Sequence, residues 1–323
     1  MPTVPAAARR HAVTPTRRRR RTPVTAPQHL TTIDLTRFDL ILVDSSAGKD
    51  SQATLDVVAN AAAAAGVLDR VTVLHCDLGH VEWPGVIELA TAQAAHYGVP
   101  IAVRRHHAGL LNLIHQRGRW PSPQARYCTS ATKRQPARRY MTERVAALNL
   151  GRPAWILNCL GMRAEESTAR AKKRAFAFDP SASNITRRKV WTWLPVHAWT
   201  EHQVWTRIHA SRAPYHPAYD LGMRRLSCTL CPLAARADLV RACQLRPDAA
   251  HEYLDLEDAI GHDFRPGLAL RDVYAEAVAT AGPHDPITTG IALDFRPRLP
   301  LRSLNAEAVT TSTALDLAGS WSR

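Results

Sequence analysis

A short apolar run followed at once by a loop of small and charged residues constrains this chain more than any other feature. Residues 38–43 have the sequence Phe-Asp-Leu-Ile-Leu-Val, which is typical of a strand covered on both faces. Residues 45–51 follow as Ser-Ser-Ala-Gly-Lys-Asp-Ser, and apolar residues then recur at helical spacing up to Gly66. A helix that begins at the carboxyl end of a strand favours the binding of an anion such as phosphate.

The loop also has the side chains that phosphate binding needs. Small residues such as Gly48 let backbone N–H groups approach an anion. Lys49 can pair with phosphate charge, and Ser46 and Ser51 can donate hydroxyl hydrogen bonds. We expect the side chains of Lys49 and Ser51 to face a ligand rather than the core. The spacing differs from that of the Walker loop. An ordinary turn capped by Asp50 is the structural alternative.

Strand and helix patterns alternate beyond this loop. We expect strands at 71–76, 101–103 and 155–160, and helices at 84–97 and 135–148. The alternation predicts an α/β fold with a doubly wound parallel sheet, in which ligands bind at the carboxyl ends of the strands. Residues 171–189 are basic and lack helical periodicity, which predicts a mobile loop over the site. Residues 191–210 return to a strand followed by a helix.

Charge is distributed unevenly along the chain, whose net charge is +14. No acidic residue precedes Asp34, while arginines occupy positions 17–21. This stretch is a solvated tail, a start-site artefact, or an arm that binds nucleic acid. No run of about 18 apolar residues indicates a membrane span, and six cysteines in so long a chain do not indicate a disulfide framework. We therefore expect a cytoplasmic protein with no membrane partner.

Five motifs in order resemble the phosphoadenosine phosphosulfate (PAPS) reductase family of the PP-loop, or adenine nucleotide alpha-hydrolase, superfamily. The resemblance covers about residues 38–240. Its motifs are Ser46-x-Gly-Lys-Asp-Ser51, Asp77-Leu-Gly79, Cys128-Thr129 with Lys133 and Pro136, Gly161-x-Arg163-x-x-Glu-Ser-x-x-Arg170, and the tryptophan- and tyrosine-containing segment from Trp193 to Gly222.

The resemblance implies roles for residues of these motifs. It implies catalytic roles for Lys49, Asp50 and Arg163. It implies nucleotide binding by Ser46, Gly48, Lys49, Ser51, Asp77, Gly79, Lys133, Gly161, Arg163 and Arg170. The alternatives are a turn capped by Asp77, a tight turn at Gly161 and a surface ion pair of Arg163. We assign Trp193, Trp199 and Trp205 to packing.

The cysteines suggest a metal centre. Cys228 and Cys231 form a Cys-x2-Cys-Pro element, with Cys243 twelve positions further and Cys128 far upstream. Four thiolates suit an iron–sulfur cluster or a zinc ion. Some relatives carry a [4Fe–4S] cluster, so the resemblance favours the cluster over zinc, and a redox dithiol or inert thiols are the remaining alternatives. Cys76 and Cys159 lie in expected strands and are assigned to the core.

These features divide the chain into four parts. We expect a disordered basic tail at 1–33, a PP-loop PAPS reductase-like nucleotide-binding domain at 34–225, a cysteine-bearing helical segment at 226–280 and an irregular tail at 281–323.

We expect an enzyme that binds ATP or a sulfonucleotide. The favoured reaction is ATP- and Mg²⁺-dependent adenylylation, which yields AMP and pyrophosphate, with sulfur transfer from a sulfur donor as a following step. A first alternative is reduction of PAPS or adenylylsulfate with a thioredoxin-like partner. The reductases of the family use a cysteine in a Glu-Cys-Gly-x-His-like motif, and no cysteine follows Cys243 in this sequence. A second alternative is a component of a nucleic-acid modification system that docks through the basic tail.

Overall fold

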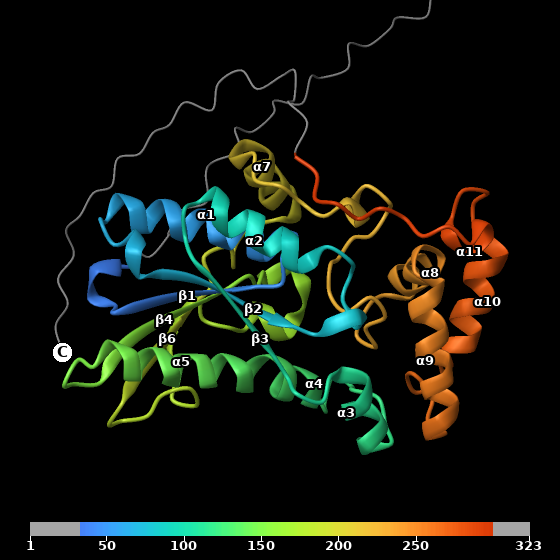
Figure 1. Cartoon of the computed structure of the whole chain (residues 1–323), viewed down its shortest axis with the longest axis horizontal. Helices are drawn as coiled ribbons and strands as arrows, with labels where there is room; N and C mark the ends of the chain where they lie inside the picture. Colours follow the sequence, from blue (N-terminus) through green and yellow to red (C-terminus); the bar gives the residue numbers. More distant parts are fainter. Residues whose placement is uncertain (1–32, 300–323) are drawn as a thin grey trace, which may run out of the picture. The chain divides into compact units, whose positions relative to one another are not determined.

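A six-stranded sheet organises the part of the chain that the computed structural model describes, residues 33–299 (Figure 1). The strand order is β3-β2-β1-β4-β6-β5, and β5 alone is antiparallel to its neighbour. The strands are β1 (Leu40–Ser45), β2 (Val71–Asp77), β3 (Ile101–Arg105), β4 (Ala154–Leu160), β5 (Phe176–Phe178) and β6 (Arg188–Trp193). The α/β fold with a doubly wound parallel sheet is confirmed.

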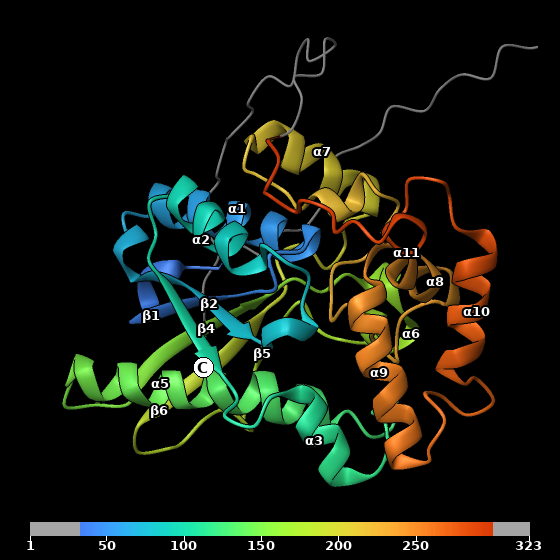
Figure 2. The same cartoon turned by 45° about the vertical axis from the view of Figure 1, so that its right-hand side comes forward.

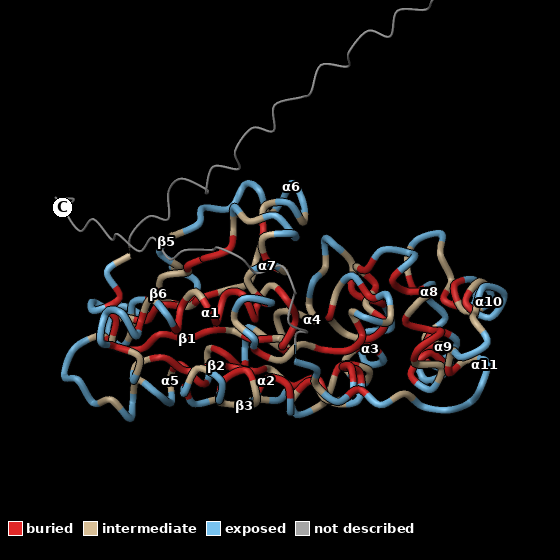
Figure 3. Tube along the Cα trace, turned by 90° about the horizontal axis from the view of Figure 1, so that it is seen from above, coloured by how far each residue is buried: buried red, intermediate tan, exposed pale blue. Residues whose placement is uncertain are grey.

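Alternate residues of β1 enter two different cores. Ile41 and Val43 pack in the cluster under α1 (Lys49–Ala64), whereas Leu40 and Leu42 pack in the cluster under α5 (Gln135–Leu148). Figure 1 shows α1 and α2 (Val86–His96) on one face of the sheet and α5 on the other. A strand covered on both faces is expected to be mostly apolar, which explains the run Leu-Ile-Leu-Val at 40–43. Figure 3 shows β1 between these layers, and every residue of it except Asp44 is buried.

Helices after residue 235 form a further group beside the sheet (Figure 2). They are α8 (Arg236–Leu245), α9 (Pro247–Ile260) and α10 (Leu270–Thr280), and α3 (Leu110–Arg117) contacts α9. The ring of Trp120 stacks on that of Tyr253 with centroids 5.5 Å apart, and Phe264 meets Trp120 edge-on at 4.9 Å. The helical nature of the cysteine-bearing segment is confirmed, while its boundary at residue 225 stays a prediction.

Residues 171–189 are not the irregular loop that their composition suggested. They contain β5 and the start of β6, and a turn between these strands is held by Asp179, whose Oδ1 accepts hydrogen bonds from the backbone amides of Ser181 and Ala182. Pairing with β6 gives this basic segment its backbone partners, which residue periodicity could not reveal over a three-residue strand.

Several short elements complete the described chain. The remaining helices are α4 (Tyr127–Thr129), a π-helical turn (Ser130–Arg134), α6 (Thr168–Ala171), α7 (Glu201–Ser211) and α11 (Pro286–Thr289), with 3₁₀ turns at Leu35–Arg37, Leu68–Arg70, Gly79–Val81, Ala164–Glu166 and Pro217–Tyr219. None of the described helices combines the length and the hydropathy needed to cross a membrane.

Residues 291–299 return toward the sheet after α11. Tyr215 and Arg298 form a β-bridge, and the ring of Phe295 packs 5.6 Å from both Trp83 and His216. Most of the expected basic tail, residues 1–32, and the end of the expected C-terminal tail, residues 300–323, lie outside the described residues.

Candidate nucleotide-binding site

The loop between β1 and α1 is fixed by its own side chains. The Ser45 Oγ accepts a hydrogen bond from the Ala47 amide at 3.0 Å, and Ser51 Oγ donates to the Gly48 carbonyl at 2.9 Å. The Ser46 amide donates to Ser51 Oγ at 3.3 Å. Ala47 has a left-handed backbone with φ of 55°, which a small residue tolerates better than a bulky one. These contacts hold a tight turn at the carboxyl end of β1.

Backbone donors are available at this turn. Within residues 33–299 no acceptor is found for the amides of Gly48, Asp50 and Ser51. The Lys49 amide, which lies between those of Gly48 and Asp50, donates a hydrogen bond of 2.9 Å to the hydroxyl of Tyr219. Unsatisfied amides at a helix N-terminus attract anions, so the turn has the donor pattern of a phosphate site.

Lys49 lies deeper than the sequence predicted. Its side chain is 5% exposed, and its Nζ donates to the Arg224 carbonyl at 2.5 Å and lies 3.5 Å from a Glu201 carboxylate oxygen. Ser51 is also buried and is bonded within the loop. The expectation that both side chains face a ligand is therefore wrong for this structure. The segment before residue 226 and the start of α7 pack over the loop and supply these partners.

Arg163 neutralises carboxylates around the loop. It is 4% exposed, its Nε donates to Asp50 Oδ1 at 2.5 Å, and it also pairs with Glu165 and, at 4.0 Å, with Glu201. Burial raises the pKa of Asp50, while Lys49 and Arg163 oppose that rise. The ion pair of Arg163 is thus a buried one and joins the loop to the turn after β4, rather than lying at the surface.

Gly161 is required by packing. A Cβ at this position would lie 2.6 Å from the Ser51 nitrogen and 2.7 Å from the Asp50 carbonyl carbon, distances that no side chain can occupy. The chain after β4 therefore passes directly against the start of α1. Arg170 lies beyond this contact and pairs with Glu166, whose carboxylate also accepts the Arg163 amide at 2.9 Å.

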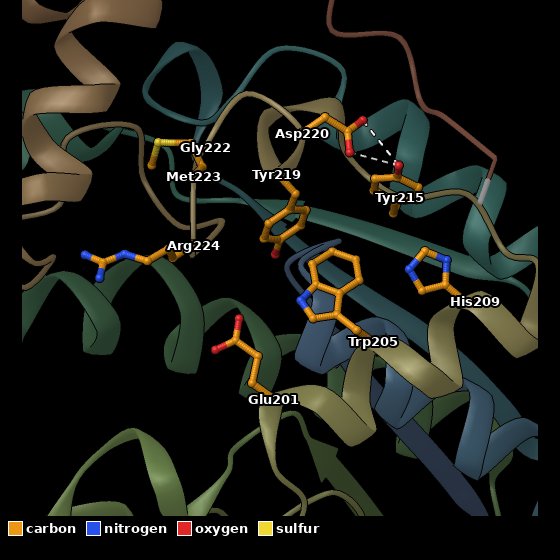
Figure 4. Close-up of a pocket in the computed structure, with 9 residues that line it drawn as sticks. All are labelled: Glu201, Trp205, His209, Tyr215, Tyr219, Asp220, Gly222, Met223 and Arg224. Atoms are coloured by element: carbon orange, nitrogen blue, oxygen red, sulfur yellow. Dashed lines mark hydrogen bonds between the residues drawn. The ribbon is translucent and has the colours of Figure 1, made fainter. Parts of the chain in front are cut away.

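A cavity of about 390 Å³ is lined by residues of α7 and of the segment at 215–224 (Figure 4). Its aromatic wall consists of Trp205, Tyr215 and Tyr219, and its acidic groups are Glu201 and Asp220. The Tyr219 ring lies 4.9 Å from Trp205, edge-on, and 5.5 Å from the Lys49 ammonium. Tyr219 and Glu201 thus belong both to the cavity and to the surroundings of Lys49, a role that sequence reasoning did not give them.

Asp77 and Gly79 form the turn after β2. Asp77 Oδ1 accepts the Gly79 amide at 2.6 Å, and Gly79 has a φ of +73°, which favours glycine. The other oxygen of Asp77 pairs with Arg105. In the described structure Asp77 therefore acts as the turn cap that was the alternative to nucleotide binding, and nucleotide binding by these residues stays a prediction.

Asp44 is a buried acid that the sequence analysis missed. Its Oδ1 is buried with no hydrogen-bond partner among residues 33–299, and Asn158 donates to Oδ2 at 3.4 Å. Burial raises the pKa of Asp44 to about 7, and the charge of Lys133 opposes the rise. Lys133 therefore lies near the carboxyl end of β1. The single acid inside an apolar strand was the signal that could have revealed Asp44.

Three of the four proposed metal-ligating cysteines lie together. Burial and the nearby Cys231 thiol raise the pKa of Cys228 to about 12, and Cys128 contributes as well. Cys243 differs in that burial alone raises its pKa to about 12; it lies on the buried side of α8, in the same apolar cluster against which the other three pack. The structure thus brings Cys128, Cys228 and Cys231 into one neighbourhood, and no thiol contributes to the raised pKa of Cys243.

The spacing of the thiols bears on the metal. Among residues 33–299, no three cysteine sulfurs lie within 4.8 Å of one another. A tetrahedral zinc ion needs sulfurs about 3.8 Å apart, whereas a cluster distributes its thiolates over separate irons. The three thiols therefore do not lie at the spacing of ligands to one tetrahedral zinc ion in the described chain. Cys159 is fully buried as expected, but Cys76 is half-buried and donates to the Lys133 carbonyl at 3.5 Å.

Two curated proteins and a solved structure illustrate what the chain is similar to. It is 25% identical over 221 residues to an uncharacterized protein of Methanocaldococcus jannaschii, which covers 68% of this chain and 47% of that protein. It is 29% identical over 153 residues to the adenosine 5'-phosphosulfate reductase of Allochromatium vinosum. This match covers 46% of this chain and 53% of that protein. The chain thus spans about half the length of the curated relatives it matches.

The solved structure is the phosphoadenylyl-sulfate reductase from Candida auris in a phosphate complex. It is 20% identical with a TM-score of 0.40, and the match covers 60% of this chain and 83% of that chain. Residues 41–234 match the family model described as phosphoadenosine phosphosulfate reductase domain, which is more than half of the chain. The protein therefore belongs to the PAPS reductase domain family of the PP-loop superfamily.

Proposed function

We propose that the loop at residues 45–51 binds the phosphates of ATP and that the enzyme adenylylates an acceptor. The observation that carries this proposal is the set of free amides at Gly48, Asp50 and Ser51 where β1 meets α1. An acceptor oxygen attacks the α-phosphorus, the bond to the β-phosphate oxygen breaks, and pyrophosphate leaves. A sulfur nucleophile can then displace AMP from the adenylylated acceptor.

Positioning and charge supply the catalysis. The free amides and the hydroxyl of Ser46 bind phosphate oxygens. Lys49 pairs with phosphate charge once Glu201 releases it, and Arg163 holds Asp50 at the start of α1. Mg²⁺ would neutralise the β- and γ-phosphates, and Asp50, at the start of α1, is the residue that we propose to help hold it.

Product analysis tests the proposal. Labelled ATP should yield AMP and pyrophosphate, and ADP as the main product would refute attack at the α-phosphate. Lys49→Met should weaken nucleotide binding at least about tenfold, because it removes one charge–phosphate pair. Lys189→Met is the matched control. Lys189 is exposed and lies at the start of β6, at the end of the sheet away from the loop, where its ammonium packs on the ring of Trp155. Equal affinity in both variants would contradict the role of Lys49.

Reduction of a sulfonucleotide is a second candidate, favoured by relatives named adenosine 5'-phosphosulfate reductase. In that reaction a thioredoxin-like dithiol supplies two electrons, the sulfate group leaves as sulfite, and AMP or its 3'-phosphate remains. Sulfite release from adenylylsulfate or PAPS with reduced thioredoxin distinguishes this candidate from adenylylation.

Cys128, Cys228 and Cys231 are proposed to bind an iron–sulfur cluster, because these three thiols gather beside Tyr253. We retain Cys243 as the proposed fourth ligand, because it lies in α8 and belongs to the apolar cluster against which the other three cysteines pack. A cluster at this place would supply redox or sulfur-binding chemistry next to the nucleotide.

A polynucleotide acceptor is favoured by charge. Residues 99–153 contain eleven lysines and arginines but one acid, Glu143, which pairs with Arg104. Several exposed arginines there form no ion pair with a carboxylate among the described residues: Arg119, Arg126, Arg134, Arg139 and Arg144. Such a surface attracts a phosphodiester backbone in a salt-dependent way.

Anisotropy with labelled DNA and RNA duplexes tests this acceptor class. The full chain should bind either duplex with an affinity that falls as salt rises. Replacing Arg134, Arg139 and Arg144 together by glutamine should weaken binding. The same replacement at three other exposed positions, Arg212, Arg271 and Arg296, should not. Loss of binding only on removal of residues 1–32 would assign the contact to the basic tail instead.

A further inference from the structure

A buried group of three potential metal ligands lies at the carboxyl end of β2. His75, Asp77 and Glu82 are 0%, 4% and 8% exposed, and one ligand atom from each lies within 4.8 Å of the others. His75 and Asp77 project from the same face of β2 at alternate positions, and Glu82 follows the 3₁₀ turn at Gly79–Val81. Among residues 33–299 no other histidine, cysteine or carboxylate group meets this spacing.

The imidazole of His75 has a defined proton at one nitrogen. Its Nδ1 lies 3.0 Å from the Ser45 carbonyl oxygen, and a carbonyl can only accept. Nδ1 therefore carries hydrogen, which leaves the lone pair of a neutral ring on Nε2. That nitrogen is buried, has no hydrogen-bond partner in the described structure, and lies 3.3 Å from Glu82 Oε2. With a neutral ring, His75 Nε2 and Glu82 Oε2 are thus two hydrogen-bond acceptors that face each other with no proton between them.

A cation between these atoms resolves the conflict. A histidine that binds a metal through Nε2 commonly donates its Nδ1–H to a backbone carbonyl, which is the contact that His75 makes with Ser45. Imidazole and carboxylate oxygens together suit divalent ions of the first transition series.

The surrounding charges leave room for such an ion. Asp77 pairs with Arg105 and accepts the Gly79 amide, and Glu82 Oε2 accepts the Leu78 amide at 3.3 Å. Each carboxylate has about four lone-pair positions, so positions remain free for a metal. The two carboxylates and Arg105 sum to one negative charge, which a divalent ion more than offsets. Other titratable groups nearby include Asp44, Lys133 and the thiols of Cys76 and Cys228.

We propose that His75 Nε2, Asp77 and Glu82 bind one divalent transition-metal ion, of which Zn²⁺ and Mn²⁺ are representative. The site is separate from the cysteine group and does not require nucleotide. It lies directly behind the phosphate loop, because His75 bonds the carbonyl of Ser45, the last residue of β1. The ion would fix the orientation of His75 and hence the position of the loop's first residue.

A charged histidine is the competing arrangement. Burial lowers the pKa of His75, but the neighbouring carboxylate of Glu82 raises it, and the net direction is upward. An imidazolium would then pair with Glu82 without any metal. Nitrogen NMR of histidine in the full chain separates these states, because a metal-bound Nε2 has no proton and an imidazolium carries protons on both nitrogens.

Metal titration is the direct test. Full-length protein freed of metal by a chelator is titrated with Zn²⁺, Mn²⁺ and Co²⁺ in the absence of nucleotide. We expect one Co²⁺ ion with a visible spectrum but without the thiolate-to-cobalt charge-transfer band that a cysteine site would give. His75→Gln and Glu82→Gln should each weaken binding of this ion by more than about 100-fold, since loss of a residue that only orients a metal ligand already costs about 10–100-fold.

Controls keep the result interpretable. His80→Gln is matched to His75→Gln, because His80 also faces a glutamate, Glu252 at 2.9 Å, but lies at the surface. It should leave the metal affinity unchanged. If a variant at position 75 or 82 loses its fold by near-ultraviolet circular dichroism, the NMR measurement on the wild-type chain decides. Wild-type protein that binds no ion of this spectral type, or in which His75 carries protons on both nitrogens with Zn²⁺ present, would overturn the proposal.

Discussion

The backbone amide of Lys49 donates a hydrogen bond of 2.9 Å to the hydroxyl of Tyr219, 170 residues later in the chain. The same hydroxyl lies where a Cβ on Gly48 would meet it at 3.3 Å. Tyr219 therefore caps the start of α1 from the direction in which the cavity opens. A phosphate bound as we propose would compete with Tyr219 for this donor.

Tyr219→Phe tests this competition. Without nucleotide the variant should be less stable by about 1 kcal/mol, because the Lys49 amide loses its acceptor. With saturating nucleotide, phosphate oxygens replace the hydroxyl, so the difference in melting temperature should shrink. Thermal melts with and without ATP measure it. Tyr274→Phe serves as a control, since its hydroxyl contacts His251 away from the loop. A deficit that is the same with and without ATP would show that phosphate does not take the Lys49 amide.

Gly161→Ala should damage the site by packing alone. The added methyl group would meet the Ser51 nitrogen at 2.6 Å, and the start of α1 would have to move. We expect loss of nucleotide binding and a destabilisation of about 1–3 kcal/mol. Calorimetry and urea unfolding measure both effects. Gly282→Ala is the matched control, because the nearest atom to its Cβ is 3.5 Å away. Normal nucleotide affinity in Gly161→Ala would mean that the loop tolerates displacement.

Asp44→Asn should change how stability depends on pH. The pKa of Asp44 is about 7 in the folded chain and near 3.8 in the unfolded chain. Between these two pH values the unfolded chain has released the proton of Asp44, whereas the folded chain retains it. The contribution of Asp44 to folding stability is therefore full below about pH 4 and is lost as pH rises to about 7. Asparagine does not titrate, so Asp44→Asn should not show this loss.

The wild-type protein should therefore lose stability relative to Asp44→Asn by a few kcal/mol across this range, since each pH unit between the two pKa values corresponds to about 1.4 kcal/mol. Urea unfolding at a series of pH values measures the difference. Asp255→Asn, at an exposed position of α9, should run parallel to wild type. A parallel course for Asp44→Asn as well would show that the buried carboxyl ionises normally.

Serine at Cys128, Cys228 or Cys231 should abolish the iron content and colour of anaerobically purified protein, because each would remove a thiolate ligand. Cys159→Ala is the control, since Cys159 is a fully buried residue of β4. Iron analysis and absorption spectra give the result. Retention of both iron and colour in Cys243→Ser would assign the fourth ligand elsewhere, and wild-type protein with neither iron nor zinc would end the metal assignment.

The residue pattern of a short stretch was sufficient to predict β1, the loop after it and α1. The apolar run at 38–43, the small residues after it and Gly66 defined β1, the loop and α1 to within two residues, because burial on both faces and helix termination leave direct marks in sequence. The importance of Gly161 was also predictable, although its reason, close contact with Asp50 and Ser51, was not.

The partners of the loop could not be predicted from local patterns. Tyr219, Glu201 and the Arg224 carbonyl reach Lys49 only through tertiary folding, and no periodicity encodes contacts between such distant positions. His75 was hidden for a different reason, since a histidine in a buried strand has the same local pattern whether it faces the core or a ligand. The wrong expectation for 171–189 came from a strand too short to show its pattern.

The enclosure of the loop has a consequence for synthesis on the ribosome. Lys49 contacts Tyr219 and Arg224 across separations of 170 and 175 residues, and β1 pairs with β4 only after Leu157 and its neighbours exist. An emerging chain can form the β1–β2 pair early, but the Tyr219 and Arg224 partners of Lys49 are absent until more than two thirds of it has been translated. Because contacts between distant positions form slowly, the enclosed form of the loop should arise as one of the last events of folding, and a chain arrested before residue 201 should carry the complete loop without Glu201 or the cavity wall of Trp205, Tyr215 and Tyr219.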